Sequence, residues 1–164
     1  MHGGLLGAIL VSWYFCKKHK INFYQLADLL VVPFALVLVF GRIANFINGE
    51  LWGTRTSVPW CVQFPGAEGC RHPSQIYEAL YSYALFWILA LMQESKRFVH
   101  GVVFWTFILL YGAFRFLTTF FRELDPTDPG ILGLGIGQWL SLAMIVAALW
   151  WLWQVKKTGH PLVR

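Results

Sequence analysis

Charged residues are scarce in this sequence, and that scarcity excludes a soluble globular domain. Only 13% of the 164 residues are charged, whereas 57% are hydrophobic. Ordinary soluble domains carry about a quarter charged residues. A soluble chain of this length could not hide so much apolar surface from water, but lipid can act as its solvent. The composition therefore predicts an all-α, polytopic integral membrane bundle.

Cysteine and histidine are also few, and their arrangement argues against metal chemistry. The chain has three cysteines and five histidines, and no spacing among them resembles a ligand set. We therefore expect no metal site. No internal repeat and no ladder of polar residues runs through a helix, which disfavours a channel or transporter. The net charge of +5 forms no basic stripe on a soluble face, so no nucleic-acid partner is expected.

Apolar stretches divide the chain into about five predicted membrane helices within a single membrane domain, 1–164. A helix needs about 20 residues to cross the hydrocarbon core. The stretches lie at about 3–16, 23–47, 73–93, 101–121 and 131–155.

The first stretch, at roughly 14 residues and about 21 Å, is too short to span alone. Either it begins inside the membrane, or an earlier part of its helix is absent from this chain. A cleaved signal peptide is disfavoured, because the basic cluster follows the apolar run and no small-residue cleavage site is present.

Lysine placement predicts the orientation of the bundle. All the lysines fall in the first gap, in the third gap or after the last span, and therefore on one side of the membrane: Lys17, Lys18, Lys20, Lys96, Lys156 and Lys157. The positive-inside rule assigns that side to the cytoplasm and the N-terminus to the outside. The longest gap, about 48–72, then lies outside. Its glycines and prolines predict an irregular, ordered loop of the kind that often carries function.

Two of the three cysteines, Cys61 and Cys70, lie in that outer loop. An oxidising compartment favours a disulfide between them, and two independent thiols are the alternative. Cys16, at the cytoplasmic end of the first stretch, is expected to be an apolar filler.

Polar residues at membrane depth are the strongest functional signal in the sequence. Arg42 and Asn45 fall near the end of the second span, and Arg115 falls inside the fourth. An unpaired charge at such depth costs at least about 2.5–3.5 kcal/mol. The two arginines therefore indicate a polar cavity in the outer half of the bundle, suited to gripping a phospholipid phosphate. Snorkelling to the headgroups is the alternative, above all for Arg122.

The segment before the third span is expected to be structural. Ser74 has the residue type of an N-cap, with Pro73 shaping the helix entry. Glu78 is placed to balance one of the arginines. His2, at the outer end of the first stretch, is a possible general base, although a single terminal histidine is more often incidental.

Several separated motifs, in this order, carry a family resemblance. They lie at 2–5 (His-Gly-Gly-Leu), 41–53, 71–78, 111–116 with 121–123, and 137–138. Together they resemble the prolipoprotein diacylglyceryl transferase family, whose members usually have about seven spanning helices. The resemblance covers essentially the whole chain and the later portion of that family.

The resemblance implies transfer of the diacylglyceryl group from phosphatidylglycerol to the lipobox cysteine of a preprolipoprotein, releasing glycerol 1-phosphate. It implies a reaction without a metal or soluble cofactor, at a site on the periplasmic side of a bacterial inner membrane. The catalytic residues it implies are His2, Arg42, Tyr111 and Arg115. The substrate-binding residues it implies are Arg42, Asn45, Glu50, Gly53 and Arg115.

Three departures from the family pattern are visible. The family's first helices are missing, Ala44 replaces a usual glycine, and Thr119 replaces an acid that commonly follows the second arginine by one turn. A truncated, catalytically impaired homologue that acts as a phospholipid-binding membrane module is therefore the alternative function.

Overall fold

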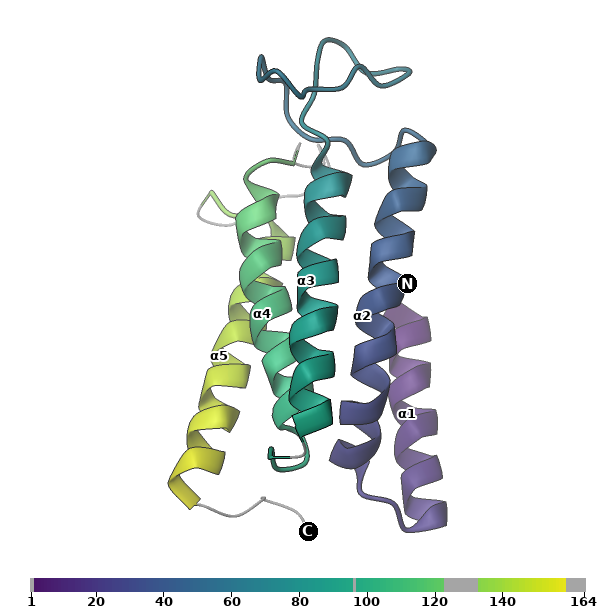
Figure 1. The fold of residues 1–164 in the computed structure, drawn as a ribbon, viewed down its shortest axis with the longest axis vertical. Coiled ribbons are helices and arrows are strands. Elements are labelled where there is room, and N and C mark those ends of the chain that lie inside the picture. Colours follow the sequence, from purple (N-terminus) through teal and green to yellow (C-terminus); the bar gives the residue numbers. More distant parts are fainter. Residues whose placement is uncertain (1, 96, 123–132, 159–164) are drawn as a thin grey trace.

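Five helices and an irregular outer loop make up the protein (Figure 1). The computed structural model describes residues 2–95, 97–122 and 133–158, without the side chains of residues 2, 5, 6 and 158. The helices are α1 (His2–His19), α2 (Phe23–Ile47), α3 (Ser74–Ser95), α4 (Val102–Thr119) and α5 (Ile136–Thr158). The predicted all-α bundle is thereby confirmed.

Helix lengths agree with the apolar stretches, with shifts at the ends. Within the described residues, α2, α3, α4 and α5 are long and apolar enough to cross a membrane, and α1 is not among them. The last helix begins at Ile136 because 133–135 form a turn before it, while 131 and 132 lie outside the described residues. These features are those of a polytopic helical membrane protein.

The N-terminal end of α1 does not reach the outer surface. α1 and α2 are antiparallel neighbours, and α1 has 18 residues where α2 has 25. In Figure 1, α1 accordingly begins part-way along α2, below its outer end. The first described turn of α1 therefore lies at membrane depth, which agrees with both explanations of its short apolar stretch.

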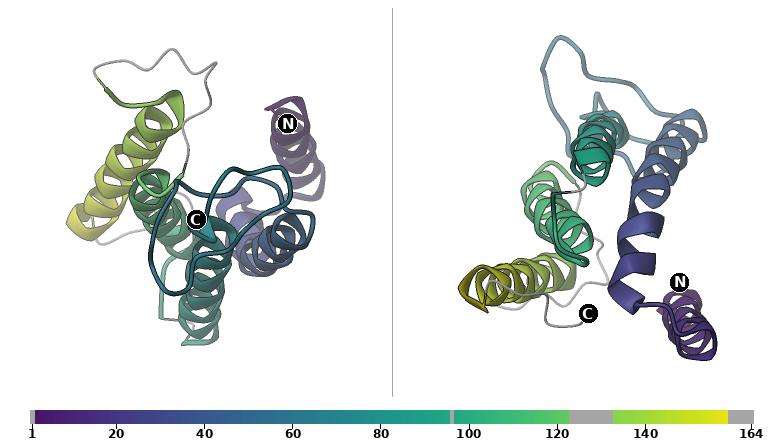
Figure 2. Two further views of the ribbon diagram at one scale, coloured as in Figure 1. Left: turned by 90° about the horizontal axis from the view of Figure 1, so that it is seen from above. Right: turned by 60° about the horizontal axis from the view of Figure 1, so that its bottom comes forward.

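Each helix packs on its neighbours in the chain. α2 packs on α3, α3 on α4 and α4 on α5, whereas α1 contacts α2 alone among the described helices. Seen from the other directions, α2 to α5 form an arc with α1 at one end (Figure 2). The buried core lies where α2, α3 and α4 meet and consists of Val31, Val32, Ala35, Leu85, Leu89, Val103 and Phe107.

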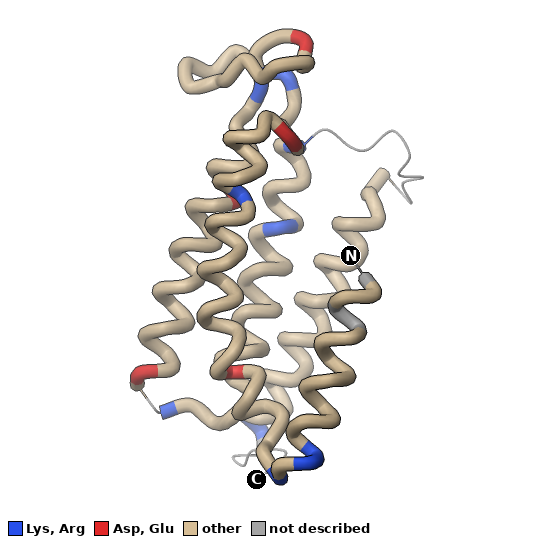
Figure 3. Tube along the Cα trace, turned by 90° about the vertical axis from the view of Figure 1, so that its right-hand side faces the viewer, with Lys and Arg blue, Asp and Glu red and all other residues tan. Residues whose placement is uncertain are grey.

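Large apolar side chains remain exposed along the outside of the helices, among them Val37, Trp87, Leu140 and Val146. A soluble monomer would not expose such a surface, whereas lipid accommodates it. The described lysines lie at the end of the bundle away from the outer loop (Figure 3), in agreement with the predicted orientation.

The start of α4 is fixed by a residue of α2. Gly101, in the left-handed region with φ 96°, precedes α4 and offers no side-chain cap. Asp28 supplies the cap, since its carboxylate oxygens accept from the backbone N–H of Gly101 at 2.6 Å and of Phe104 at 2.8 Å. An anion at a helix N-terminus stabilises the unpaired amides there. Asp28 thereby sets the position of α4, and of Arg115 on it, relative to α2.

The outer loop is held by backbone pairs and by a disulfide between Cys61 and Cys70, which confirms the favoured pairing. Arg71, which follows Cys70 directly, forms antiparallel bridges with Arg55 and with Val62. Arg55 precedes Cys61 in the chain, and Val62 follows it directly. Cys16, buried at the end of α1, is a free thiol.

The expected N-cap role of Ser74 is wrong. Ser74 is the first residue of α3, and its hydroxyl donates to the carbonyl of Leu51 at 3.0 Å. The backbone of Pro73 accepts the first helical bonds instead. The hydroxyl therefore ties the helix to the loop.

Candidate active site

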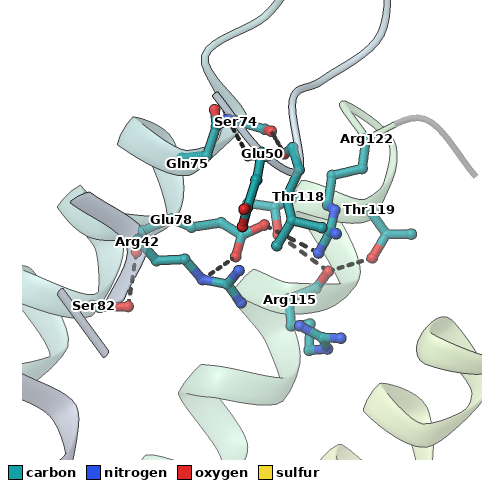
Figure 4. Close-up of polar contacts among 11 residues, drawn as sticks. Arg42, Glu50, Ser74, Gln75, Glu78, Ser82, Arg115, Thr118, Thr119 and Arg122 are labelled. Carbon is teal, nitrogen blue, oxygen red and sulfur yellow. Dashed lines mark hydrogen bonds and ion pairs between the residues drawn. The ribbon is translucent and has the colours of Figure 1, made fainter. Parts of the chain in front are cut away.

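A buried carboxylate joined to two guanidinium groups forms the centre of the site. Glu78 of α3 is 3% exposed, and its Oε2 lies 2.7 Å from Nε of Arg42 on α2. Its Oε1 lies 3.6 Å from Nη1 of Arg122, which follows α4 (Figure 4). The expected balancing role of Glu78 is confirmed, and it extends to two arginines. Arg122 is therefore an ion-pair partner, and snorkelling does not describe it.

Burial lowers the pKa of the Arg122 guanidinium, because a cation loses solvation there, and the nearby Glu78 carboxylate opposes that shift. Ion pairs removed from water are strong only when both partners are present. Glu78 therefore holds α2, α3 and the end of α4 together at the depth where the sequence predicted a polar cavity.

Of the three arginines in this region, Arg115 is the one for which the described residues supply no ion-pair partner. Its guanidinium makes no hydrogen bond or ion pair to any residue that the structure describes. The backbone carbonyl of Arg115 is occupied, since the hydroxyl of Thr119 donates to it at 2.7 Å. Thr119 therefore satisfies the helix backbone and leaves the charge of Arg115 unbalanced.

The Arg115 side chain reaches the first turn of α5. Its Nη2 lies 4.0 Å from the point that a Cβ on Gly137 would occupy. Just before this turn, the side-chain oxygen of Gln138 accepts from the backbone N–H of Gly135 at 3.0 Å. A helix N-terminus carries partial positive charge, so the α5 terminus adds to the positive potential around Arg115.

Among the described residues, the site has an excess of positive charge. Arg42, Arg115 and Arg122 all interact electrostatically in this region, and Glu78 is the one buried carboxylate that the described part of the chain places among them. Figure 4 places Glu50 on the outer side of this group, and its side chain is exposed. Of the groups that the structure describes here, one buried and one exposed carboxylate do not balance three guanidinium groups, and such a described set favours an anion as ligand.

The motif at 41–53 is held over the site by contacts with α3. Gln75, which is 1% exposed, donates from Nε2 to the backbone carbonyl of Glu50 at 2.6 Å. Gly53 pairs with Arg122 in an antiparallel bridge. A Cβ on Gly53 would lie 2.4 Å from the carbonyl oxygen of Phe121 and 2.7 Å from Cβ of His72. Glycine is therefore required at position 53 for the loop to close on the end of α4.

The other predicted site residues have less specific surroundings. Asn45, half-buried, lies one turn after Arg42 on α2, and its carbonyl accepts from the N–H of Glu50 at 2.9 Å. The ring of Tyr111 stacks on Phe107, with centroids 5.4 Å apart. His2 is the first residue of α1, and its side chain lies outside the described part of the chain.

Sequence reasoning missed two contributors to the site. The pairing of Arg122 with Glu78 joins segments far apart in the chain, and no local pattern signals it. Tyr81, one turn after Glu78, is buried beside the arginines, and its position three residues after an intramembrane acid was the available signal. Among the described residues, no group of three histidine, cysteine or acidic side chains could hold a metal ion.

Comparison with known proteins gives a consistent picture. The family model described as prolipoprotein diacylglyceryl transferase matches residues 1–154. A phosphatidylglycerol–prolipoprotein diacylglyceryl transferase of Geobacter sulfurreducens is 46% identical over 150 residues, covering 90% of this chain and 58% of that relative. Those of Idiomarina loihiensis and Coxiella burnetii are each 43% identical, over 95% of this chain and 59% and 62% of the relatives. The chain thus spans about three-fifths of the length of these curated relatives.

Proposed function

Because the chain belongs to the prolipoprotein diacylglyceryl transferase family, we propose that it transfers the diacylglyceryl group of phosphatidylglycerol to a cysteine thiol. The acceptor is the lipobox cysteine of a preprolipoprotein, and glycerol 1-phosphate is released. The observation that supports the proposal is the guanidinium of Arg115, which makes no hydrogen bond or ion pair with any residue that the structure describes. A guanidinium held at membrane depth without a counter-charge is costly unless a ligand supplies one.

The arginines bind and stabilise the phosphate. Arg42 is oriented through its Nε by Glu78, which leaves its terminal nitrogens for a phosphate oxygen. Arg115 projects from α4 on the side away from the Arg42–Glu78 pair (Figure 4), and its charge adds to the positive potential of the same region. During transfer the bridging oxygen of the phosphate gains negative charge, and donors that are already oriented stabilise that charge without reorganisation.

The bond changes are simple. The cysteine sulfur forms a bond to the glycerol carbon of the diacylglyceryl group, and the bond from that carbon to the phosphate oxygen breaks. The thiol proton passes to a base, for which His2 is the proposed residue, because the thiolate is the competent nucleophile. Glycerol 1-phosphate leaves as an anion.

The remaining residues orient the lipid. We assign Asn45, Glu50 and Tyr111 to hydrogen bonds with the headgroup and its ester region, and Gly53 to the close approach of the loop. The reaction takes place on the periplasmic side of a bacterial inner membrane. Support comes from the disulfide in the loop above the site, which suits an oxidising compartment.

An assay that separates lipid binding from transfer tests the proposal. The purified chain is given phosphatidylglycerol and a lipobox peptide, and both lipid binding and the peptide mass are measured. We expect transfer by the wild type, at least a hundredfold less with Arg42→Ala or Arg115→Ala, and loss with His2→Ala. Arg55→Ala is the matched control, since Arg55 is exposed and pairs with Glu68 in the loop.

Lipid binding that depends on Arg42 and Arg115, without any lipidated peptide from the wild type, would refute the transfer. It would establish the phospholipid-binding module as the function. Equal binding by both arginine variants and the wild type would refute the site itself.

A further inference from the structure

A tyrosine that the proposed mechanism does not use lies beside the arginines. Tyr81 of α3 is 8% exposed, yet its hydroxyl makes no hydrogen bond to any residue that the structure describes. A buried phenol normally finds a hydrogen-bond partner. The missing partner is therefore informative.

The ring of Tyr81 is fixed by aromatic contacts with α4. It stacks on Phe114, with centroids 5.2 Å apart and an interplanar angle of 8°. It also meets the edge of Tyr111 at 6.3 Å. Phe114 directly precedes Arg115, so the contact that fixes the Tyr81 ring lies next to the arginine that has no partner.

The hydroxyl of Tyr81 points toward the charged group. Side chains on a helix lean toward its N-terminus, and the N-terminus of α3 is its outer end. Tyr81 follows Glu78 by three residues and so lies on the same face. Consistent with this direction, Tyr81 interacts electrostatically with Glu78, Arg42 and Arg115.

The hydroxyl is also within reach of a ligand. Among the described residues that are not exposed, the side-chain oxygens and nitrogens that are fully enclosed and make no hydrogen bond belong to Gln75, Glu78 and Trp105, although that Glu78 oxygen pairs with Arg42 as an ion. The hydroxyl of Tyr81 is not in this group, so it retains accessible surface. Its ring is therefore held in place while its one polar atom remains accessible.

We propose that Tyr81 is a third phosphate ligand, whose hydroxyl donates to a non-bridging phosphate oxygen of the phospholipid that Arg42 and Arg115 bind. This inference rests on the proposed function and adds a substrate-binding residue to it. An anion that spans the two guanidinium groups presents an acceptor to a donor beside both of them. A neutral donor there strengthens phosphate binding without adding to the repulsion among the cations.

The experiment compares two lipids that differ in the phosphate group. Binding of a short-chain phosphatidylglycerol and of the diacylglycerol with the same acyl chains is measured in uncharged, phosphate-free detergent. Tyr81→Phe removes the hydroxyl and keeps the ring that packs on Phe114. A hydrogen bond to a charged group predicts about tenfold weaker binding of phosphatidylglycerol, and unchanged binding of diacylglycerol.

Tyr83→Phe is the matched control, because Tyr83 lies on the same helix with 48% of its surface exposed. It should leave both affinities unchanged. Equal losses for both lipids with Tyr81→Phe, or no loss for phosphatidylglycerol, would overturn the assignment.

The Arg115→Ala variant in the same measurement separates this inference from the proposed function. If Arg115→Ala weakens phosphatidylglycerol binding and Tyr81→Phe does not, the role of Tyr81 alone is refuted. If Arg115→Ala also binds phosphatidylglycerol like the wild type, the phosphate site is refuted as well. Neither arm depends on turnover.

Discussion

Replacing Glu78 with glutamine is the perturbation that tests the charged centre most sharply. Glu78→Gln keeps the shape of the side chain and removes the charge that Arg42 and Arg122 share at 2.7 and 3.6 Å. Removing one partner of a buried ion pair typically destabilises a protein by about 3–5 kcal/mol. Because Arg42 and Arg122 keep 17% and 24% of their side-chain surfaces exposed, we expect a smaller loss than this range, about 2–3 kcal/mol.

The free energy of unfolding is measured by denaturant titration in detergent micelles, with intrinsic tryptophan fluorescence as the signal. Glu68→Gln is the control, since Glu68 pairs with Arg55 while 86% of its side chain is exposed, and its effect should stay within about 0.5 kcal/mol.

A second substitution tests the cause of the loss. If the instability of Glu78→Gln comes from unpaired cations, the double variant Glu78→Gln/Arg122→Gln should recover part of it, because one of those cations is removed. Additive losses would contradict the account, as would equal effects of Glu78→Gln and Glu68→Gln. Transfer should also fall with Glu78→Gln, because Arg42 loses the partner that orients it.

Further predictions concern the elements around the site. Asp28→Asn should destabilise the protein by about 1–2 kcal/mol and speed amide exchange in the first turn of α4, because that turn loses its charged cap; unchanged exchange would contradict the role of Asp28. Cys61→Ser/Cys70→Ser should lower stability by about 2–3 kcal/mol through the freer unfolded loop and raise exchange at residues 54–71, and the reduced wild type should behave like this variant in denaturant titration. Gly53→Ala should reduce transfer more than its loss of folded protein explains, because the added Cβ separates the loop from the end of α4; a fully active Gly53→Ala variant would show that this approach is unnecessary.

The helices were predictable because one requirement, that lipid solvate their side chains, determines most of their sequence. Spans that lipid must solvate are long and apolar, and their bounds therefore follow from hydropathy. The end of α1 was less predictable. Its last turn carries Lys17 and Lys18, and an apolar stretch ends at such charged residues although the helix continues through them. The start of α5 depends on the turn at Gly133, where φ is 77°, and hydropathy does not report that geometry.

The charges of the site were predictable, whereas its pairings were predictable only in that Glu78 was expected to balance one of the arginines. Arg42 and Arg115 were recognisable because a charged side chain at membrane depth is energetically costly, so its presence there indicates a functional site. The partner of each arginine depends on which helices meet, and the sequence alone left Arg122 between snorkelling and pairing. Ser74 shows the same limit, because its residue type fits a cap while a carbonyl from a distant loop takes its hydroxyl.

The most direct test of the central claim is the stoichiometry of the two products. Purified wild type is incubated with phosphatidylglycerol and a lipobox peptide, and the thioether-linked peptide and free glycerol 1-phosphate are quantified together. The account predicts equal amounts of both, each lost with Arg115→Ala and retained with Arg55→Ala. Glycerol 1-phosphate without lipidated peptide, or lipid that is bound while neither product forms, would contradict it.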